Sequence, residues 1–410
     1  MGAQFKEGME TTRPTEPSWS PVVSPPFAEK CEEVVRKILV ELECKGRDPN
    51  QPSLGGAAGL ALLYATAARV FGEERLQDKA SEYLEFVLNG LEKVPLSVSL
   101  WGGLVGSLWA LTYLEVPVEG VAEVQDQLEQ HVSTASRGSV SYDLISGLVG
   151  IGVYGRSLGR DHPIFRAVVD RLIQWAVVDD MGARWATPAS LLDDQRRTQF
   201  PDGLVDLGIA HGGAGVIALL SSAVPGRPEL RPLLQEAVKW QRLRCLPDSR
   251  RWAGFFSPDG PALPPARDGW CYGAPGIGAA MLAAGVALGS SETMTLGREI
   301  LSDVTRRSAR ERAIVDAGLC HGTAGTALVM MRAAQNGNDE LAAFARQELA
   351  ATLEYGSRAE GIGGFMSYHH ESGWRLDASL FTGATGIALA LLAAISSTPP
   401  DWDQLLLLSD

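Results

Sequence analysis

The sequence predicts an all-α fold, a closed α/α toroid in which seven helical hairpins supply seven inner and seven outer helices. Three observations predict it. A Gly-x-x-Gly turn recurs seven times along the 410 residues. Each turn leads into a run that is apolar on nearly every side, as a helix buried all round must be. Amphipathic stretches alternate with these runs, and repetition of such pairs is typical of stacked helical hairpins.

The glycine turns divide the chain into seven repeats. Their first glycines are Gly56, Gly103, Gly147, Gly212, Gly273, Gly322 and Gly383. An open solenoid would leave one side of its inner helices exposed, so the apolar runs favour a closed ring. Glycine lets helices approach closely and tolerates positive φ. We expect the turns at the N-termini of the inner helices, all at one end of the barrel.

The first elements are predicted from composition and periodicity. Residues 1–26 are rich in Pro, Ser, Thr and Glu, which predicts a disordered arm. Apolar residues at helical spacing predict a helix over residues 27–44. Residues 27–410 are expected to form a single toroid domain.

Three insertions are longer than the other connections, and they span residues 182–206, 247–268 and 356–377. They are rich in Gly, Pro, Asp and aromatic residues, and we expect them to form the rim of a cleft at the glycine end of the barrel. Residues 251–260 are interpreted as a short hairpin, because aromatic residues precede a Ser-Pro-Asp-Gly turn.

The overall composition excludes several classes of protein. The net charge is −13 and no long Lys/Arg run occurs, so non-specific nucleic-acid binding is not expected. Five cysteines without regular spacing do not predict a disulfide framework and fit a reducing cytoplasm. The longest apolar run, near residues 387–395, is too short to span a bilayer.

Cys and His concentrate just before the glycine turns of three consecutive repeats. Aligned on the first glycine, the two preceding positions are Leu54-Gly55, Trp101-Gly102, Ile145-Ser146, Ala210-His211, Cys271-Tyr272, Cys320-His321 and Phe381-Thr382. Repeats adjacent in a ring are adjacent in space, so these Cys and His side chains should converge. Zinc prefers such ligands. His211 is either a fourth ligand or a neighbouring acid/base, and we favour the second, because a catalytic zinc keeps one position open.

The same segments resemble motifs of the lanthionine synthetase C-like family, the lanthipeptide cyclases. The resemblance covers about residues 30–396 and rests on Tyr-Asp-Leu-Ile-Ser-Gly, Ala-His-Gly-Gly-Ala-Gly, Arg-Asp-Gly-Trp-Cys-Tyr-Gly-Ala-Pro-Gly and Leu-Cys-His-Gly-Thr-Ala-Gly. It implies an α/α toroid with a central Zn²⁺. The ligands would be Cys271, Cys320 and His321. The resemblance makes His211 the acid/base and adds Asp143, Arg267 and Tyr272 as further site residues.

The resemblance also implies an activity and partners. Such an enzyme adds a Cys thiol of a dehydrated precursor peptide to dehydroalanine or dehydrobutyrine, which makes a thioether ring. The nucleophile is a thiolate, and a free thiol has a pKa of about 8.5; zinc binding deprotonates it. Arg267 can stabilise the resulting enolate and His211 can supply a proton. A dehydratase and a transporter are candidate partners in a biosynthetic complex.

Other interpretations of these residues remain open. Asp143 could cap the third inner helix, Arg267 could form an ion pair at the rim, and Tyr272 could serve packing alone. Outside the site, we expect Cys31, Cys44 and Cys245 to be small core residues, and His369-His370 to lie on the surface.

Two other functions also remain open. A prenyltransferase-like zinc-thiolate enzyme would use the same fold class, although an Asp would be expected among its ligands. A non-catalytic peptide-binding scaffold would keep the fold without the reaction.

Overall fold

The structure, a computed structural model, describes residues 19–45, 51–247, 249–258, 260–335 and 337–410. Seven inner helices surround its centre: α2 (Ala57–Phe71), α4 (Leu104–Tyr113), α6 (Leu148–Ser157), α9 (Gly213–Ala223), α11 (Ala274–Leu288), α14 (Thr323–Ala334) and α16 (Ala384–Ile395). Seven outer helices surround these: α1 (Pro25–Lys45), α3 (Glu74–Lys93), α5 (Val121–Thr134), α7 (Pro163–Trp175), α10 (Arg231–Leu243), α12 (Ser291–Thr305) and α15 (Asp339–Tyr355).

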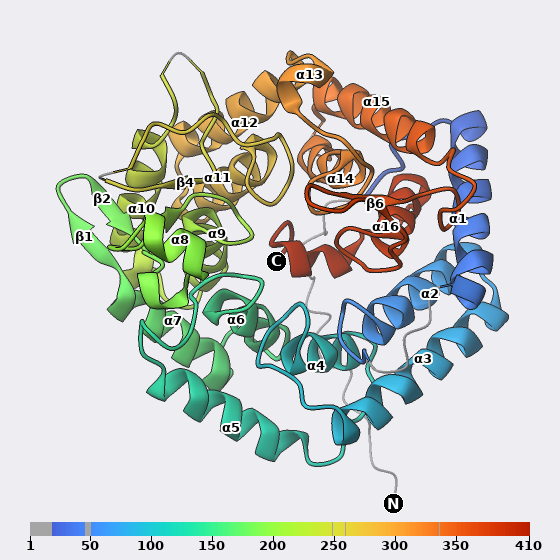
Figure 1. Cartoon of the computed structure of the whole chain (residues 1–410), viewed down its shortest axis with the longest axis horizontal. Helices are drawn as coiled ribbons and strands as arrows, with labels where there is room; N and C mark the ends of the chain where they lie inside the picture. The colour runs from blue at the N-terminus through green and yellow to red at the C-terminus, as the bar shows by residue number, and fades with distance from the viewer. Residues whose placement is uncertain (1–18, 46–50, 248, 259, 336) are drawn as a thin grey trace, which may run out of the picture.

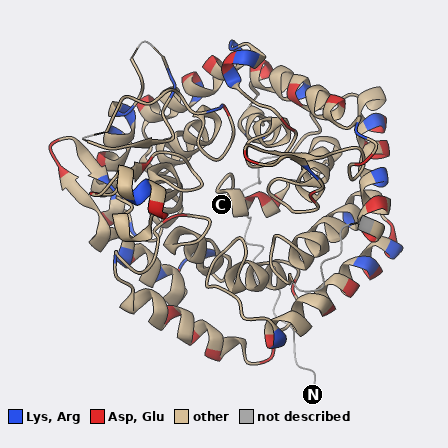
Figure 2. Ribbon diagram, in the orientation of Figure 1, with Lys and Arg blue, Asp and Glu red and all other residues tan. Residues whose placement is uncertain are grey.

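The inner helices form a closed ring (Figure 1). Each inner helix contacts the next one along the chain, and α16 contacts α2. The outer helices α3, α7, α12 and α15 pack on the inner helices that precede them, whereas α1 packs on α16 and completes the last pair. Figure 2 shows charged residues mainly on the outer ring, as the amphipathic periodicity requires. The predicted toroid is confirmed.

Each Gly-x-x-Gly turn starts an inner helix, and only one of the two expected reasons for glycine applies. The first glycine is the N-cap residue of its helix, and its φ is negative in all seven turns, for example −128° at Gly212. Positive φ is therefore not what selects glycine here. A Cβ atom on the second glycine of the motif would collide with a backbone carbonyl; at Gly276 it would meet the Trp270 oxygen and lie 2.7 Å from Ile209 Cγ2. Close backbone approach selects glycine.

Short strands and helices occupy the connections between the helical hairpins. They are β1 (Val177–Asp179), β2 (Gly182–Arg184), α8 (Asp194–Gln199), β3 (Val205–Asp206), β4 (Phe255–Phe256), α13 (Ala309–Arg312), β5 (Ser367–His369) and β6 (Gly373–Arg375). The hairpin predicted within residues 251–260 is wrong, because β4 pairs with β3 of the preceding insertion. The Phe255 ring packs edge-on against Phe200 of that insertion, with ring centroids 5.0 Å apart.

Residues after the last repeat fill the hole of the ring. The 3₁₀-helix η3 (Asp401–Leu406) lies in the centre of Figure 1. Trp402, Leu405 and Leu406 are fully buried, and the indole nitrogen of Trp270 donates to the Leu406 oxygen at 3.0 Å. The repeats end with α16, before this segment. The repeat pattern therefore predicted no element in the centre of the ring.

The N-terminal arm predicted over residues 1–26 lies partly outside the described residues. Of the part that is described, Trp19 is buried and donates to the Ala393 oxygen at 3.0 Å, and helix α1 begins at Pro25. Residues 19–26 therefore pack against the ring. Among the described residues, no helix combines the length and the apolar character that crossing a bilayer requires.

Replacing the second glycine of a turn should destabilise the ring. In Gly386→Ala, the new methyl group would meet the Leu380 carbonyl oxygen and lie 2.8 Å from Leu319 Cδ1, and overpacking of this kind costs about 1–3 kcal/mol. Gly226→Ala is the control, because its nearest neighbouring atom would lie 3.9 Å away. Urea denaturation followed by circular dichroism should show a clear loss of stability for the first variant alone. Equal stabilities would contradict the close-approach explanation.

Candidate metal and acid–base site

Backbone hydrogen bonds connect the segments that precede neighbouring glycine turns. We call the six residues before each first glycine the pre-glycine segment. The Ala210 N–H donates to the Cys271 oxygen (3.1 Å), the Cys271 N–H to the Cys320 oxygen (3.0 Å), and the Cys320 N–H to the Phe381 oxygen (2.7 Å). Each of these residues stands two places before its glycine. The ladder therefore sets corresponding positions of neighbouring repeats side by side.

This register brings Cys271, Cys320 and His321 together. Their ligand atoms all lie within 4.8 Å of one another, and no second group of this kind occurs among the described residues. Cys271 is buried, whereas the other two are partly exposed. His211 is not part of the group. Two sulfurs and one imidazole nitrogen make a donor set that suits zinc and leaves a fourth position open.

A buried carboxylate lies behind His321. Asp316 Oδ2 is 3.5 Å from His321 Nε2 and accepts from the Tyr368 N–H at 3.0 Å, while Oδ1 accepts from the Gly318 N–H at 3.3 Å. Because Nε2 faces Asp316, Nδ1 is the nitrogen left for the sulfurs. Metal-binding histidines commonly have such a carboxylate on their other nitrogen.

The sequence analysis missed Asp316, although its register carried a signal. Asp316 stands six residues before its first glycine, as Asp377 does in the next repeat. Asp377 likewise accepts from the side chain just before its glycine, with 2.6 Å between its Oδ2 and Thr382 Oγ1. An alignment of the whole pre-glycine segment would have shown Asp316 as a candidate partner of His321.

The protonation of the cluster favours an anionic sulfur. The hydrogen bond with Cys320 lowers the pKa of Cys271 to about 5, with a further contribution from His321 and against the effect of burial. The same hydrogen bond, together with burial, raises the pKa of Cys320. Burial opposes the charged form of His321, but Asp316 and Cys271 outweigh it and raise its pKa to about 9. These interactions thus favour a thiolate at Cys271 and the protonated form of His321.

His211 is held between a carboxylate and an aromatic ring. Its Nδ1 lies 2.7 Å from Asp143 Oδ2, and its ring stacks on Tyr272 with centroids 5.5 Å apart. Asp143 Oδ1 accepts from the backbone N–H (2.8 Å) and the hydroxyl (3.1 Å) of Ser146. No side chain caps α6, so the alternative that Asp143 caps the third inner helix is wrong.

The register also explains why Asp143 reaches His211. Asp143 stands four residues before its first glycine. In the next two repeats this position is Gly208 and Gly269, whose Cβ positions would lie 2.7 Å from the Cα atoms of Tyr272 and His321. Each such residue therefore faces the residue just before the glycine of the following repeat. Only the third repeat carries a carboxylate there.

The carboxylates around His211 favour its protonated form. Burial would lower its pKa, but the hydrogen bond and charge of Asp143 outweigh this effect and raise it, and Asp206 and Cys271 add to the rise. Asp206, which the sequence analysis did not single out, is buried and accepts from the Thr187 hydroxyl at 3.0 Å. Burial raises the pKa of Asp206 to about 6. The charges around His211 thus favour the protonated imidazole, and its charge interacts with Cys271 of the sulfur cluster.

Arg267 and Tyr272 border the same space. Arg267 is partly exposed and its charge lies close enough to Cys320 to favour the thiolate. No ion pair between described residues includes Arg267; the nearby buried carboxylates Asp268 and Glu348 pair with Arg307 and Arg312 instead, which removes the support for a rim ion pair. Tyr272 is partly exposed and contacts His211, so packing against the imidazole is one function that it has.

The predicted burial of the cysteines and histidines outside the site is confirmed for some residues and wrong for another. Cys31 is a core residue, as predicted, but the prediction for Cys44 is wrong, because it is exposed near the end of α1. Cys245 is half-buried, with its sulfur 2.8 Å from the Ser249 oxygen. His369 and His370 are exposed, as predicted.

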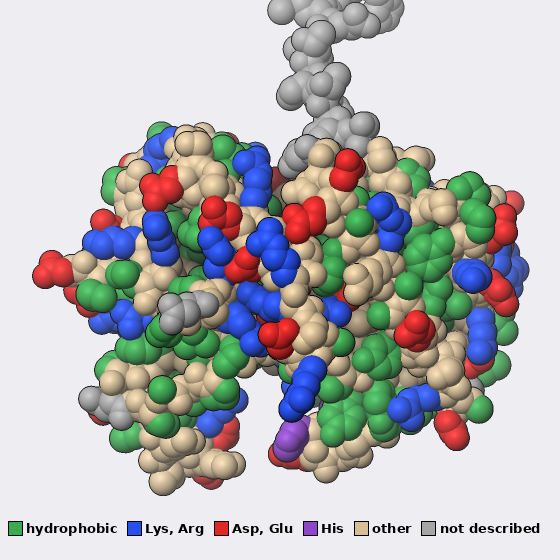
Figure 3. All heavy atoms as spheres, turned by 90° about the horizontal axis from the view of Figure 1, so that it is seen from above, with side chains coloured by type: hydrophobic (Ala, Val, Ile, Leu, Met, Phe, Trp, Pro, Cys, Tyr) green, Lys and Arg blue, Asp and Glu red, His purple; other side chains and the backbone are tan. Residues whose placement is uncertain are grey.

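The surface of the ring is notched on one side. Figure 3 views the molecule edge-on and shows a notch between two projecting parts of the surface. Each of the three insertions precedes a glycine turn in the chain, and Figure 1 shows β4 and β6 crossing in front of the ring. Acidic and basic side chains are interspersed on the side seen in Figure 3.

Known proteins share this architecture. A family model described as lanthionine synthetase C-like protein matches residues 50–407. The nisin biosynthesis protein NisC of Lactococcus lactis subsp. lactis is 22% identical over 301 residues, which are 66% of this chain and 70% of that protein. A solved structure of nisin cyclase matches with a TM-score of 0.74 at 20% identity, covering 94% of this chain and 98% of that one.

The structural likeness shows a shared fold, and the family match includes all seven glycine turns, the sulfur cluster and the His211–Asp143 pair. The chain belongs to the lanthionine synthetase C-like family.

Proposed function

We propose that this protein is a zinc-dependent lanthipeptide cyclase. It adds Cys thiolates of a dehydrated precursor peptide to dehydroalanine or dehydrobutyrine and forms lanthionine or methyllanthionine rings. The observation that carries the proposal is the group of Cys271, Cys320 and His321 near the His211–Asp143 pair. The relationship to NisC, whose name refers to nisin biosynthesis, supports the same class of substrate.

The donor atoms fit zinc. Two sulfurs and a nitrogen lie within 4.8 Å of one another, the pKa of the Cys271 thiol is lowered, and Asp316 Oδ2 lies 3.5 Å from His321 Nε2. Three protein ligands leave one position for a substrate group, as in catalytic sites. Zinc bound there would keep the incoming substrate sulfur as a thiolate at neutral pH.

The remaining steps concern this chain's own side chains. The sulfur forms a bond to the β-carbon of the alkene, and the displaced π electrons move to the carbonyl oxygen as an enolate. Arg267 carries no intramolecular ion pair among the described residues, so its charge is available to stabilise that oxygen. The α-carbon then takes a proton from His211, which presents Nε2 because Nδ1 is held by Asp143. A neutral His211 can accept the proton of the next thiol.

The alternatives have less support. A prenyltransferase-like enzyme would be expected to have an Asp among the zinc ligands, and the group contains none. A non-catalytic scaffold would have no need of the pairing between His211 and Asp143. We further propose that the enzyme works in the cytoplasm, with a dehydratase and a transporter as partners in biosynthesis.

Removal of a sulfur should remove the metal. Cys320→Ala leaves only Cys271 and His321, which cannot hold zinc tightly, so metal analysis should fall from one zinc per chain to near zero and cyclisation should stop. Cys44→Ala is the control, because that exposed cysteine belongs to α1. Retained stoichiometric zinc in Cys320→Ala would contradict the assignment.

His211→Asn should separate catalysis from metal binding. The variant should keep full zinc content and the helical circular dichroism, while cyclisation of a dehydrated peptide slows by about 10²-fold or more, the usual contribution of a general acid/base. Loss of zinc together with activity would make His211 a ligand. Wild-type cyclisation would remove it from the mechanism.

Asp316→Asn should weaken zinc binding, because the amide cannot hold the His321 imidazole as a carboxylate does. Loss of such a partner typically lowers metal affinity about 10- to 100-fold, and chelator competition measures this change. Asp377→Asn is a matched control, since Asp377 has the same register in the next repeat but accepts from Thr382. Equal zinc affinities for the two variants would show that Asp316 has no effect on the ligand.

A further inference from the structure

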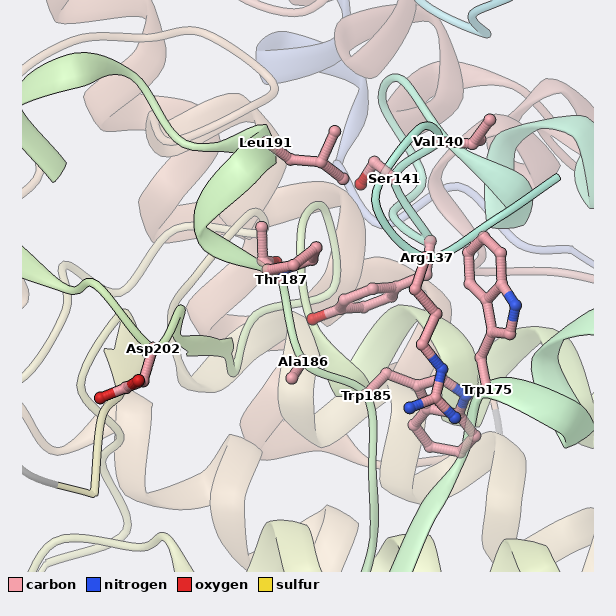
Figure 4. A pocket seen from close by; sticks show the side chains of 11 residues that line it. Arg137, Val140, Ser141, Trp175, Trp185, Ala186, Thr187, Leu191 and Asp202 are labelled. Carbon is pink, nitrogen blue, oxygen red and sulfur yellow. The ribbon is translucent and has the colours of Figure 1, made fainter. Parts of the chain in front are cut away.

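Most tryptophans of this chain are core residues. All ten lie in the described part of the chain, and eight of them are buried. Two of the eight, Trp175 and Trp185, line the pocket in Figure 4, which no residue of the proposed site lines. Trp101, before α4, and Trp374, on β6, are partly exposed instead. An indole that stays open to solvent offers a large apolar surface for binding.

The register of the glycine turns places Trp101 close to the sulfur cluster. Trp101 stands two residues before its first glycine, as Cys320 and Phe381 do. Phe381 follows Cys320 in the backbone ladder, since the Cys320 N–H donates to the Phe381 oxygen at 2.7 Å. The Trp101 ring stacks on the Phe381 ring, with centroids 3.9 Å apart and planes 6° from parallel. The indole is therefore the second neighbour of Cys320 along this row of side chains.

Glycines leave room for the indole at the glycine-turn end of the ring. The first repeat has Gly55 just before its turn, and a Cβ atom there would lie 3.6 Å from Trp101 Cζ2. The second repeat has Gly102 in the same place; it is exposed, and its Cβ position has no atom within 4 Å. In the fourth to sixth repeats this place holds His211, Tyr272 and His321. The row of residues just before the turns thus combines reactive side chains with open space beside an indole.

We propose that the Trp101 indole binds an apolar side chain of the precursor peptide, next to the residue that reacts. The proposal rests on the proposed function, because it gives that site a specificity-determining residue. The open space at Gly102 gives the peptide access. The stack on Phe381 holds the indole in place before binding, so little conformational entropy is lost when the peptide binds. An indole surface favours aromatic and aliphatic groups over polar ones.

Binding of short peptides tests the indole without the reaction. The probes are acetyl-Gly-Phe-Cys-Phe-Gly-amide and the same peptide with Asn in place of both Phe residues. Isothermal titration calorimetry on the zinc-loaded protein measures their affinities, and the Cys thiol brings both probes to the open ligand position. We expect the Phe peptide to bind about tenfold more tightly than the Asn peptide. Equal affinities, or no binding of the Phe peptide, overturn the proposal.

Removing the indole should abolish this preference. Trp101→Ala should bind the two peptides equally with zinc content unchanged, whereas Trp101→Phe should keep the preference to within about threefold, because a phenyl ring restores apolar surface. In cyclisation assays the loss in Trp101→Ala should appear as a higher KM rather than a lower kcat, since the residue takes no part in bond formation. A Phe preference that survives in Trp101→Ala overturns the proposal.

Covering the indole should have the same effect as removing it. Tyr272 stacks on His211, which stands at the same place in the preceding repeat, so a side chain at position 102 should lie beside Gly55, where the indole packs. Gly102→Leu should therefore lose the Phe preference with thermal unfolding unchanged. Gly226→Leu is the matched control, because Gly226 is exposed and the nearest atom to its Cβ position lies 3.9 Å away. Should Trp101→Ala fail to fold, a wild-type preference in Gly102→Leu overturns the proposal.

The outcomes distinguish this inference from the proposed function. Phe-selective binding that Trp101→Ala and Gly102→Leu both abolish, in a protein that forms no thioether, supports the assignment of the indole and refutes the cyclase. Thioether formation with a KM that neither substitution changes refutes the assignment of the indole and leaves the cyclase intact.

Discussion

The backbone hydrogen bonds between neighbouring pre-glycine segments determine where every reactive group lies. Because the Cys271 N–H donates to the Cys320 oxygen, two sulfurs from separate repeats stand side by side without a short sequence motif between them. The glycines make this possible, since any larger residue at Gly276 would push its helix away from the Trp270 carbonyl. The position of the sulfurs therefore depends on the close approach of Gly276 to the Trp270 carbonyl, a contact that involves no reactive side chain.

The two histidines of the site receive their carboxylates in different ways, and this difference separates their proposed functions. His321 takes Asp316 from its own pre-glycine segment, which leaves its other nitrogen facing the sulfurs. His211 takes Asp143 from the preceding repeat, which holds it at the edge of the cluster. One ring register thus places the proposed ligand His321 and the proposed proton donor His211 at equivalent positions of their repeats.

The sequence predicted the parts of the structure that repeat. The seven turns predicted the ring, and their alignment was enough to group Cys271, Cys320 and His321. Asp143 entered through family resemblance alone, and Asp316 and Asp206 were missed, because only two positions of each repeat were compared. The pairing of β4 with β3 and the position of η3 follow from contacts between distant, non-repeating segments, which periodicity does not report.

Closure of the ring between α2 and α16 has a consequence for biosynthesis of the protein itself. Domains assemble as the chain leaves the ribosome, N-terminal parts first. The apolar flank of α2 that faces α16 stays uncovered while five intervening hairpins are translated. The three proposed zinc ligands come from adjacent repeats and can meet earlier. An incomplete chain could therefore hold metal while one side of its first repeat remains open to chaperones or to aggregation.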